Sequence, residues 1–205
     1  SAASDVYKRQ KLGFFKVAEV AVGADITTLH EAEEFLEKVP KEIDFLTSSC
    51  CPAFVDLVKK HFPEYDDNIS KTTSPMVSCA RYLKDKYPDA LTCFIGPCIA
   101  KKAETIAHPE SMDFTLTFEE LQCLLDGVGI DLNDSDAPEV QSEAAAGGIG
   151  FPLLRGVQSS MKEVLPEDLQ KNCRLEYAAG LRNCHEKLQQ IKDGKLQAAT
   201  TWKAW

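Results

Sequence analysis

Two short motifs set a cysteine beside a proline. Residues 47–54 read Thr-Ser-Ser-Cys-Cys-Pro-Ala-Phe, and residues 95–102 read Ile-Gly-Pro-Cys-Ile-Ala-Lys-Lys. Each motif comes directly after a short apolar run and directly before a helical pattern, so each is expected where a strand ends. Open α/β sheets bind ligands outside the carboxyl ends of their strands. Thiolates that meet there could hold an iron–sulfur cluster, whose ligands are usually four cysteines.

The segments around these motifs alternate between strand and helix patterns. We expect strands at 14–22, 43–48, 91–95, 114–116 and 175–178. We expect helices at 28–39, 52–61, 74–87, 117–127, 147–164 and 181–191. Pro52 suits the first position of its helix, and Thr117 with Glu120 can form a capping box. Repeated strand–helix units predict an α/β fold with a mainly parallel sheet and helices on both faces.

Composition narrows the class of protein. A chain of 205 residues that is 44% hydrophobic can bury a full core and is most simply one domain. Its 23 basic and 32 acidic residues give a net charge of −9, which argues against nucleic acid or an anionic membrane surface as the main partner. No apolar run approaches the length of a membrane span.

The eight cysteines indicate a reducing compartment. A disulfide scaffold would be expected in a secreted protein with a signal peptide, and the N-terminal residues have no long apolar stretch, so we expect a cytoplasmic location. Cysteine is also a common small packing residue. We predict that packing role for five of the eight: Cys79, Cys93, Cys123, Cys173 and Cys184.

Four short motifs occur in order along residues 22–196. They are Gly23-Ala24-Asp25-Ile26-Thr27 with the acidic helix after it, Ser49-Cys50-Cys51-Pro52, Ser74-Pro75, and Pro97-Cys98 with Lys101, Lys102 and Glu104. In this order and spacing the chain resembles the catalytic domain of iron-only (FeFe) hydrogenases and their relatives. The resemblance implies chemistry on H2 and protons at a 4Fe-4S cluster joined to a two-iron subsite, together called the H-cluster.

The resemblance also implies residues that bind this cofactor. Cys51 and Cys98 match two of the four thiolate ligands of the cubane cluster. Lys101 matches the residue whose ammonium meets a cyanide ligand of the two-iron subsite, and a compact three-donor cation suits such an anion. Four further residues match positions that line the same pocket: Ser74, Pro75, Gly96 and Pro97.

Cys50 has a different implied role from its neighbour Cys51. In the family, the residue at this position passes a proton to or from the open iron site. The onward carriers would be Glu31, Ser70 and Glu34, with Lys38 at the place where a basic residue closes the family's chain. Carboxylates and hydroxyls can relay protons through short hydrogen bonds, and the spacing of Glu31 and Glu34 puts both on one helix face. The alternative is that Glu31, Glu33, Glu34 and Glu37 form a plain solvated face.

Three positions depart from the pattern of well-characterised hydrogen-evolving members. Gly96 stands where those members carry methionine, Met76 where they carry glutamine, and Phe54 where they carry tryptophan. Changes beside a metal group alter its packing and hydrogen bonding, so we expect an altered potential or slow turnover. These departures place the chain closest to the sensory branch of the family, in which the domain is coupled to signalling domains and hydrogen is detected.

The third cysteine motif of the family, Glu-Gly-Met-Ala-Cys followed by a further cysteine, is missing from these residues. It would begin near residue 200, and a shifted reading frame of the codons for residues 199–205 can spell Glu-Gly-Met. We therefore expect 1–10 to be a non-native leader, 11–198 a partial catalytic domain and 199–205 a frame-shifted tail. With two of four cubane ligands, this polypeptide is predicted to be inactive and to hold no cluster stably. Electron-transfer iron–sulfur modules or a ferredoxin would be partners of the intact protein, which the family places in anaerobic metabolism.

Two other classes of function stay open. One is a non-enzymatic iron–sulfur relative with a cluster-assembly or protein-binding role. The other is a zinc site built from Cys50, Cys51, Cys93 and Cys98, although adjacent cysteines suit tetrahedral zinc poorly. Retention of Lys101, Cys50, Glu31 and Glu34 favours hydrogenase chemistry over the non-enzymatic relative.

Overall fold

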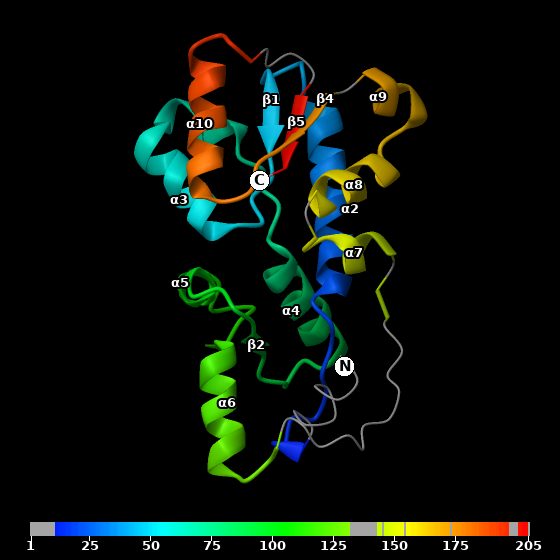
Figure 1. Cartoon of the computed structure of the whole chain (residues 1–205). Helices are drawn as coiled ribbons and strands as arrows, with labels where there is room; N and C mark the ends of the chain where they lie inside the picture. Colours follow the sequence, from blue (N-terminus) through cyan, green and yellow to red (C-terminus); the bar gives the residue numbers. More distant parts are fainter. Residues whose placement is uncertain are drawn as a thin grey trace. The chain divides into compact units, whose positions relative to one another are not determined.

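A computed structural model describes residues 11–131, 143–144, 146–153, 155–172, 174–196 and 201–204 (Figure 1). The chain divides into two compact units, which are described separately. Ser1–Val20 with Ala80–Glu143 forms the first unit, and Ala21–Cys79 with Ala144–Trp205 forms the second. The expected leader at 1–10 and the packing role of Cys173 lie outside the described residues.

The second unit contains a three-stranded parallel sheet. Its strands are β1 (Phe45–Thr47), β4 (Arg174–Tyr177) and β5 (Thr201–Ala204), in the order β1-β5-β4. Strands β1 and β4 confirm two of the expected strands. Strand β5 falls in the segment 199–205, expected to be a frame-shifted tail. Its pairing with β1 and β4 does not test whether a frame error produced this segment, so that origin stays a prediction.

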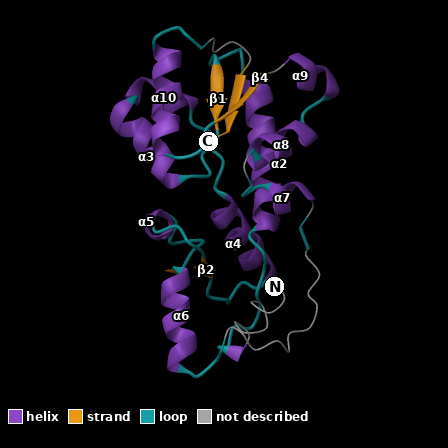
Figure 2. Cartoon of the chain, viewed as in Figure 1, coloured by secondary structure: helices purple, strands orange, loops and turns teal. Residues whose placement is uncertain are grey.

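Helices cover both faces of this sheet, as the alternation of strand and helix patterns predicted (Figure 2). On one face, Phe45 of β1 packs with α3 (Pro52–His61) and α10 (Leu181–Lys192). On the other face, Leu46 packs with α2 (Ala21–Lys38) and α8 (Gly156–Val164). Neighbouring residues of a strand point to opposite faces, so Phe45 and Leu46 belong to two different cores. Helix α9 (Glu167–Asn172) and the 3-10 turn at Pro63–Asn68 complete the unit.

The expected strand at 14–22 is wrong. Helix α2 begins at Ala21, seven residues before the expected start, and no strand occurs between residue 11 and β1. A short apolar run cannot distinguish a strand from a helix segment by periodicity alone. Packing decides here: a side chain at Gly23 would come within 2.0 Å of the Pro75 carbonyl oxygen, so the start of α2 fits closely against the start of α4 (Pro75–Lys86).

The single helix expected at 147–164 is also wrong, because the chain forms two helices there. Helix α7 (Ala146–Gly150) and α8 are separated by a bend in which Arg155 has a φ of 65°. Pro152 has no backbone N–H and disfavours the helical conformation of the residue before it, which explains the interruption.

The first unit contains a two-stranded parallel sheet of β2 (Cys93–Ile95) and β3 (Phe114–Leu116). Helix α5 (Ala100–Ala107) connects the two strands, and α6 (Phe118–Gly127) follows β3. Helix α4 begins in the second unit and ends in the first. Within the described residues, no helix is both long and apolar enough to cross a membrane.

The predicted capping box of α6 is confirmed. The Glu120 amide donates to Thr117 Oγ1 at 3.2 Å, and the Thr117 amide donates to Glu120 Oε2 at 2.8 Å. We expect Thr117→Ala to lower the free energy of unfolding by about 1 kcal/mol. Chemical denaturation followed by circular dichroism measures this, with Cys123→Ala, an exposed position of the same helix, as the control. Equal losses for the two variants would contradict a specific role for the box.

Candidate functional site

The first cysteine motif forms the loop between β1 and α3. Cys51 occupies the N-cap position of α3, and its carbonyl oxygen accepts hydrogen bonds from the amides of Phe54 and Val55, both at 3.0 Å. Cys50 and Cys51 are partly exposed, and neither is in a disulfide. The structure therefore confirms that this thiol pair follows a parallel strand and begins a helix.

Glu31 is a fully buried carboxyl group near the middle of α2. Its Oε1 accepts from Ser48 Oγ at 2.8 Å and from the Ser49 amide at 3.1 Å, while its Oε2 is buried with no partner among the described residues. Burial raises the pKa of Glu31 to about 7, and the two hydrogen bonds offset this only in part. A group with this pKa exchanges a proton readily near neutral pH.

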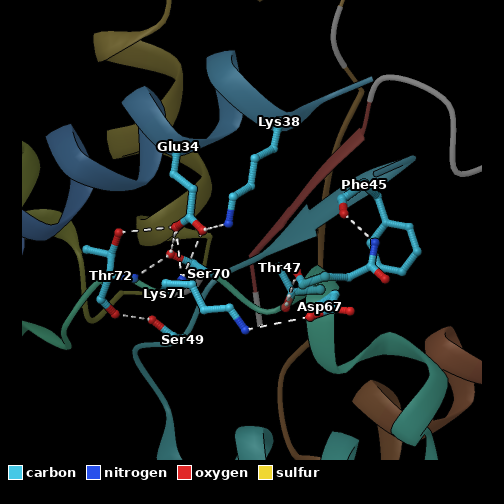
Figure 3. Close-up of polar contacts among 10 residues, drawn as sticks. Glu34, Lys38, Phe45, Thr47, Ser49, Asp67, Ser70, Lys71 and Thr72 are labelled. Atoms are coloured by element: carbon cyan, nitrogen blue, oxygen red, sulfur yellow. Dashed lines mark hydrogen bonds and ion pairs between the residues drawn. The ribbon is translucent and has the colours of Figure 1, made fainter. Parts of the chain in front are cut away.

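Glu34 lies three residues further along α2 and is held as a carboxylate (Figure 3). Lys38 Nζ donates to Oε1 at 2.6 Å, Ser70 Oγ donates to Oε2 at 2.6 Å, and the Lys71 amide contacts both oxygens. Burial alone would raise the pKa of Glu34, but these donors outweigh it and lower the pKa below its ordinary value. The pKa values of two neighbouring carboxyl groups are thus shifted in opposite directions.

The solvated-face alternative is wrong for these two residues. Glu31 is 0% exposed and the Glu34 side chain is 11% exposed, whereas Glu33 and Glu37 are exposed to solvent. Lys38 forms an ion pair with Glu34, four residues earlier on the same helix.

Hydrogen bonds link the predicted proton carriers in part, and the hydrogen bond from Cys50 to Ser48 is made by the backbone amide of Cys50. The Cys50 amide donates to Ser48 Oγ at 3.3 Å, and Ser48 in turn donates to Glu31. Ser70 donates to Glu34, but Glu31 and Ser70 make no hydrogen bond to each other. Proton movement between Glu31 and Ser70 therefore requires a water molecule or a rotation of a side chain. No role was predicted for Ser48 from the sequence, although this residue lies within the first cysteine motif, two positions before Cys50.

Ser74 directly precedes α4 at a position where serine usually caps a helix. Its hydroxyl does not do so: Ser74 is 2% exposed, and its Oγ has no partner among the described residues. Pro75 is buried beside it. A buried hydroxyl without a partner carries a free-energy cost, so this group is available to a ligand.

The second cysteine motif belongs to the first unit. Cys98 follows β2, and its carbonyl oxygen accepts from the Lys101 amide at 3.2 Å in the first turn of α5. Lys101 Nζ contacts Glu104 Oε2 at 2.6 Å, and these side chains are only 12% and 11% exposed. Lys101 is therefore mostly buried and paired with Glu104, unlike a typical solvated surface lysine.

Gly96 and Pro97 lie between β2 and Cys98. Gly96 is buried, and a Cβ at this position would come within 2.6 Å of the Phe94 ring, whereas Pro97 is exposed. A methionine at Gly96 would therefore require the Phe94 ring to move. Because Cys51 and Cys98 belong to different units, their predicted convergence on one centre stays a prediction.

The other cysteines differ in burial. Cys79 and Cys184 are 4% and 3% exposed, which fits the packing role. Cys93 is partly exposed, and the packing role predicted for Cys123 is wrong, because this residue is exposed on α6. Burial, with a smaller contribution from the nearby Cys51, raises the pKa of Cys184 to about 11. Among the described residues, no group of three or more His, Cys, Asp or Glu side chains could hold a metal ion.

Comparison with protein families gives the class of the protein. The family described as the iron-only hydrogenase large subunit, C-terminal domain, matches residues 5–201. The chain belongs to this family. The match confirms the resemblance that the two cysteine motifs indicated.

Two curated relatives are hydrogenases. Iron hydrogenase 1 of Clostridium pasteurianum is 27% identical over 214 residues, covering 93% of this chain and 37% of the relative. The periplasmic Fe hydrogenase large subunit of Nitratidesulfovibrio vulgaris (strain Hildenborough) is 30% identical over 172 residues, covering 74% of this chain and 41% of the relative. The chain thus spans well under half the length of these relatives.

Solved structures share the fold. The apo form of FeFe-hydrogenase HydA1 from Chlamydomonas reinhardtii superimposes with a TM-score of 0.71 at 20% identity, covering 98% of this chain and 70% of that one. A structure that records stepwise H-cluster assembly in a HydA protein gives a TM-score of 0.77 at 18% identity, covering 100% of this chain and 70% of that one. The α/β architecture is therefore that of the FeFe-hydrogenase catalytic domain.

Proposed function

We propose that this chain is part of a catalytic domain that interconverts H2 with two protons and two electrons. The observation that carries the proposal is the pair of carboxyl groups beside the cysteine loop. Glu31 can exchange a proton near neutral pH, and Glu34 stays charged against Lys38 and Ser70. A solvated acidic helix has neither arrangement, whereas a proton path to a buried site can use both.

The proton carriers are proposed to act in the order Cys50, Glu31, Ser70 and Glu34. The thiol of Cys50 lies in the loop whose amides and hydroxyls hold Glu31, so a proton released there has a nearby acceptor. The unpartnered Glu31 Oε2 accepts that proton, and rotation of the carboxyl group or a bridging water carries it to Ser70 and Glu34. Lys38 then sits at the end where the path meets solvent.

The residues present fit an H-cluster in part. The unpartnered hydroxyl of Ser74 and the thiols of Cys50 and Cys51, which are not in disulfides, would supply part of the polar and thiol groups of such a pocket. Cys51 and Cys98 would bind the cubane, and Lys101, Ser74, Pro75, Gly96 and Pro97 would surround the two-iron subsite. When bound, the cofactor supplies the redox chemistry and the site at which H2 is split.

We further propose a sensory role for the intact protein, with an altered potential or slow turnover. Gly96, Met76 and Phe54 differ from the hydrogen-evolving pattern, and a side chain at Gly96 would require the Phe94 ring to move. Rapid hydrogen evolution by the complete protein would contradict this role. Signalling domains, iron–sulfur modules or a ferredoxin would be its partners, and a cytoplasmic location is proposed from cysteine usage.

The 205-residue chain itself is predicted to be inactive, since two of the four cubane thiolates lie in a motif that these residues do not contain. We expect anaerobic reconstitution with iron and sulfide to give well under one cubane per chain. Iron analysis and electron paramagnetic resonance measure this. A stable, stoichiometric cubane would contradict the prediction.

One alternative function has an observation in its favour. The cytosolic Fe-S cluster assembly factor NAR1 of Scheffersomyces stipitis is 28% identical over 124 residues, covering 56% of this chain. Anaerobic infrared spectroscopy of the complete protein after maturation separates the two functions. Carbonyl and cyanide bands are expected for the hydrogenase, and their absence would favour an assembly or protein-binding role.

A further inference from the structure

Three buried or partly buried hydroxyl groups meet between α2 and the start of α4. Thr27 Oγ1 lies 3.0 Å from Ser78 Oγ, Ser78 Oγ lies 2.8 Å from Thr73 Oγ1, and Thr27 Oγ1 donates to the Thr73 carbonyl oxygen at 3.0 Å. We call these three residues the hydroxyl ring. Thr27 is 0% exposed and Ser78 is 4% exposed, so the ring is shielded from water.

Each hydroxyl of the ring has one hydrogen to donate. Thr27 donates to the Thr73 carbonyl oxygen, and Ser78 Oγ also lies 3.3 Å from that oxygen, so the single Ser78 hydrogen can go to Thr27 Oγ1, to Thr73 Oγ1 or to the Thr73 carbonyl. In each arrangement Thr27 and Ser78 contact both polar groups of Thr73, its carbonyl oxygen and its hydroxyl. A network satisfied in this way is rigid, because any movement of Thr73 breaks two of its bonds.

The ring lies beside the loop that carries Ser74. The carbonyl oxygen of Thr72, in the same loop, accepts from Ser49 Oγ at 2.5 Å. This hydrogen bond ties the loop to the first cysteine motif. Gly23, one turn before Thr27 on α2, allows the Pro75 carbonyl to approach closely. Residues 72–75 are therefore held from α2, from α4 and from the cysteine loop.

The unpartnered hydroxyl of Ser74 indicates the role of the restraint on residues 72–75. A buried serine at a helix start would normally turn its hydroxyl to the helix amides, or its loop would shift to expose it. Neither occurs at Ser74. We propose that the hydroxyl ring is a positioning device that fixes residues 72–75 against the Cys50–Cys51 loop and keeps the Ser74 hydroxyl available to the bound cofactor. The cofactor part rests on the proposed function; the positioning part does not.

The test compares two neighbouring threonines. Thr28 is buried on the same helix, and its hydroxyl donates only to the Ala24 carbonyl of its own helix, at 2.8 Å. Thr27→Val and Thr28→Val make the same chemical change, but only Thr27→Val opens the ring. Hydrogen–deuterium exchange of the 205-residue chain, read by mass spectrometry, should show exchange at 70–74 about tenfold faster in Thr27→Val and unchanged in Thr28→Val. Thr27→Ser keeps the hydroxyl and should restore the wild-type rate.

Ser78→Ala provides a second test of the ring in case Thr27→Val does not fold. Ser78→Ala removes the middle hydroxyl and should accelerate the same segment; the double variant with Thr27→Val should add little, because either change opens the ring. Equal exchange at 70–74 in Thr27→Val and Thr28→Val, or acceleration spread over the whole second unit, would overturn the proposal.

The cofactor part has a separate readout in the matured complete protein. The infrared bands of the two-iron subsite should shift in Thr27→Val and stay in place in Thr28→Val. Unshifted bands together with faster exchange would overturn the link to Ser74. Absence of bands from the wild type would count against the proposed function, while the exchange result would still decide the positioning role.

Discussion

Replacing Glu31 with glutamine is expected to flatten the dependence of stability on pH between about 4.5 and 7. Glu31 has a pKa of about 7 in the folded chain and an ordinary value of 4.5, so folding favours its protonated form. Its stabilising contribution is fully present below pH 4.5 and is lost as the pH rises to 7. At about 1.4 kcal/mol for each pKa unit, this loss is on the order of 3 kcal/mol.

Urea denaturation at a series of pH values between 4 and 8.5 measures the effect. The wild type should lose stability across the interval, and Glu31→Gln, which cannot ionise, should lose much less. The comparison of slopes is preferable to the comparison of absolute stabilities, because glutamine also places an amide group where Oε2 is buried. Parallel slopes for the two proteins would show that Glu31 is not buried as described.

Glu34→Gln is the matched control on the same helix face. The pKa of Glu34 is lowered, so this carboxylate stabilises the fold above pH 4.5, and the contribution is lost as the pH falls. The variant should lose roughly 1–2 kcal/mol at pH 7, where hydrogen bonds from Lys38 and Ser70 to a charged group are removed. It should be more nearly normal at low pH, the opposite of Glu31→Gln.

In the complete, matured protein, Cys50→Ala should reduce hydrogen turnover by about 10²- to 10⁴-fold and leave the cofactor in place. This is the range expected when a positioned proton donor is removed. Hydrogen evolution with a reduced dye measures turnover, and infrared bands report whether the two-iron subsite is retained. The prediction rests on the proposed function.

Cys51→Ala is the matched comparison, since it removes the adjacent thiol by the same change. Here iron and infrared bands should be lost together with activity, because the thiolate is a proposed cluster ligand. Loss of iron from Cys50→Ala, or retention of a full cluster in Cys51→Ala, would mean that the roles of the two cysteines have been assigned in the wrong order.

The sequence by itself determined the class of protein, the fold class and most of the elements. Cysteine–proline motifs after apolar runs are local patterns, and the strands β1, β2, β3 and β4 with the helix α3 follow from local patterns as well. It also determined that Glu31 and Glu34 share a helix face, since that depends only on helical periodicity. Periodicity failed at 14–22 and 147–164, where a close approach at Gly23 and a break at Pro152 set the helix ends.

Only the tertiary structure decided which carboxyl group has a raised pKa and which has a lowered one. Both belong to one acidic run, and nothing local distinguishes them. Residues distant in sequence make the difference: Ser48 and Ser49 enclose Glu31 with too few donors to offset burial, whereas Ser70 and Lys71 join Lys38 around Glu34. A pKa depends on the three-dimensional balance of burial, charge and hydrogen bonds, and that balance exists only once the chain has brought these segments together.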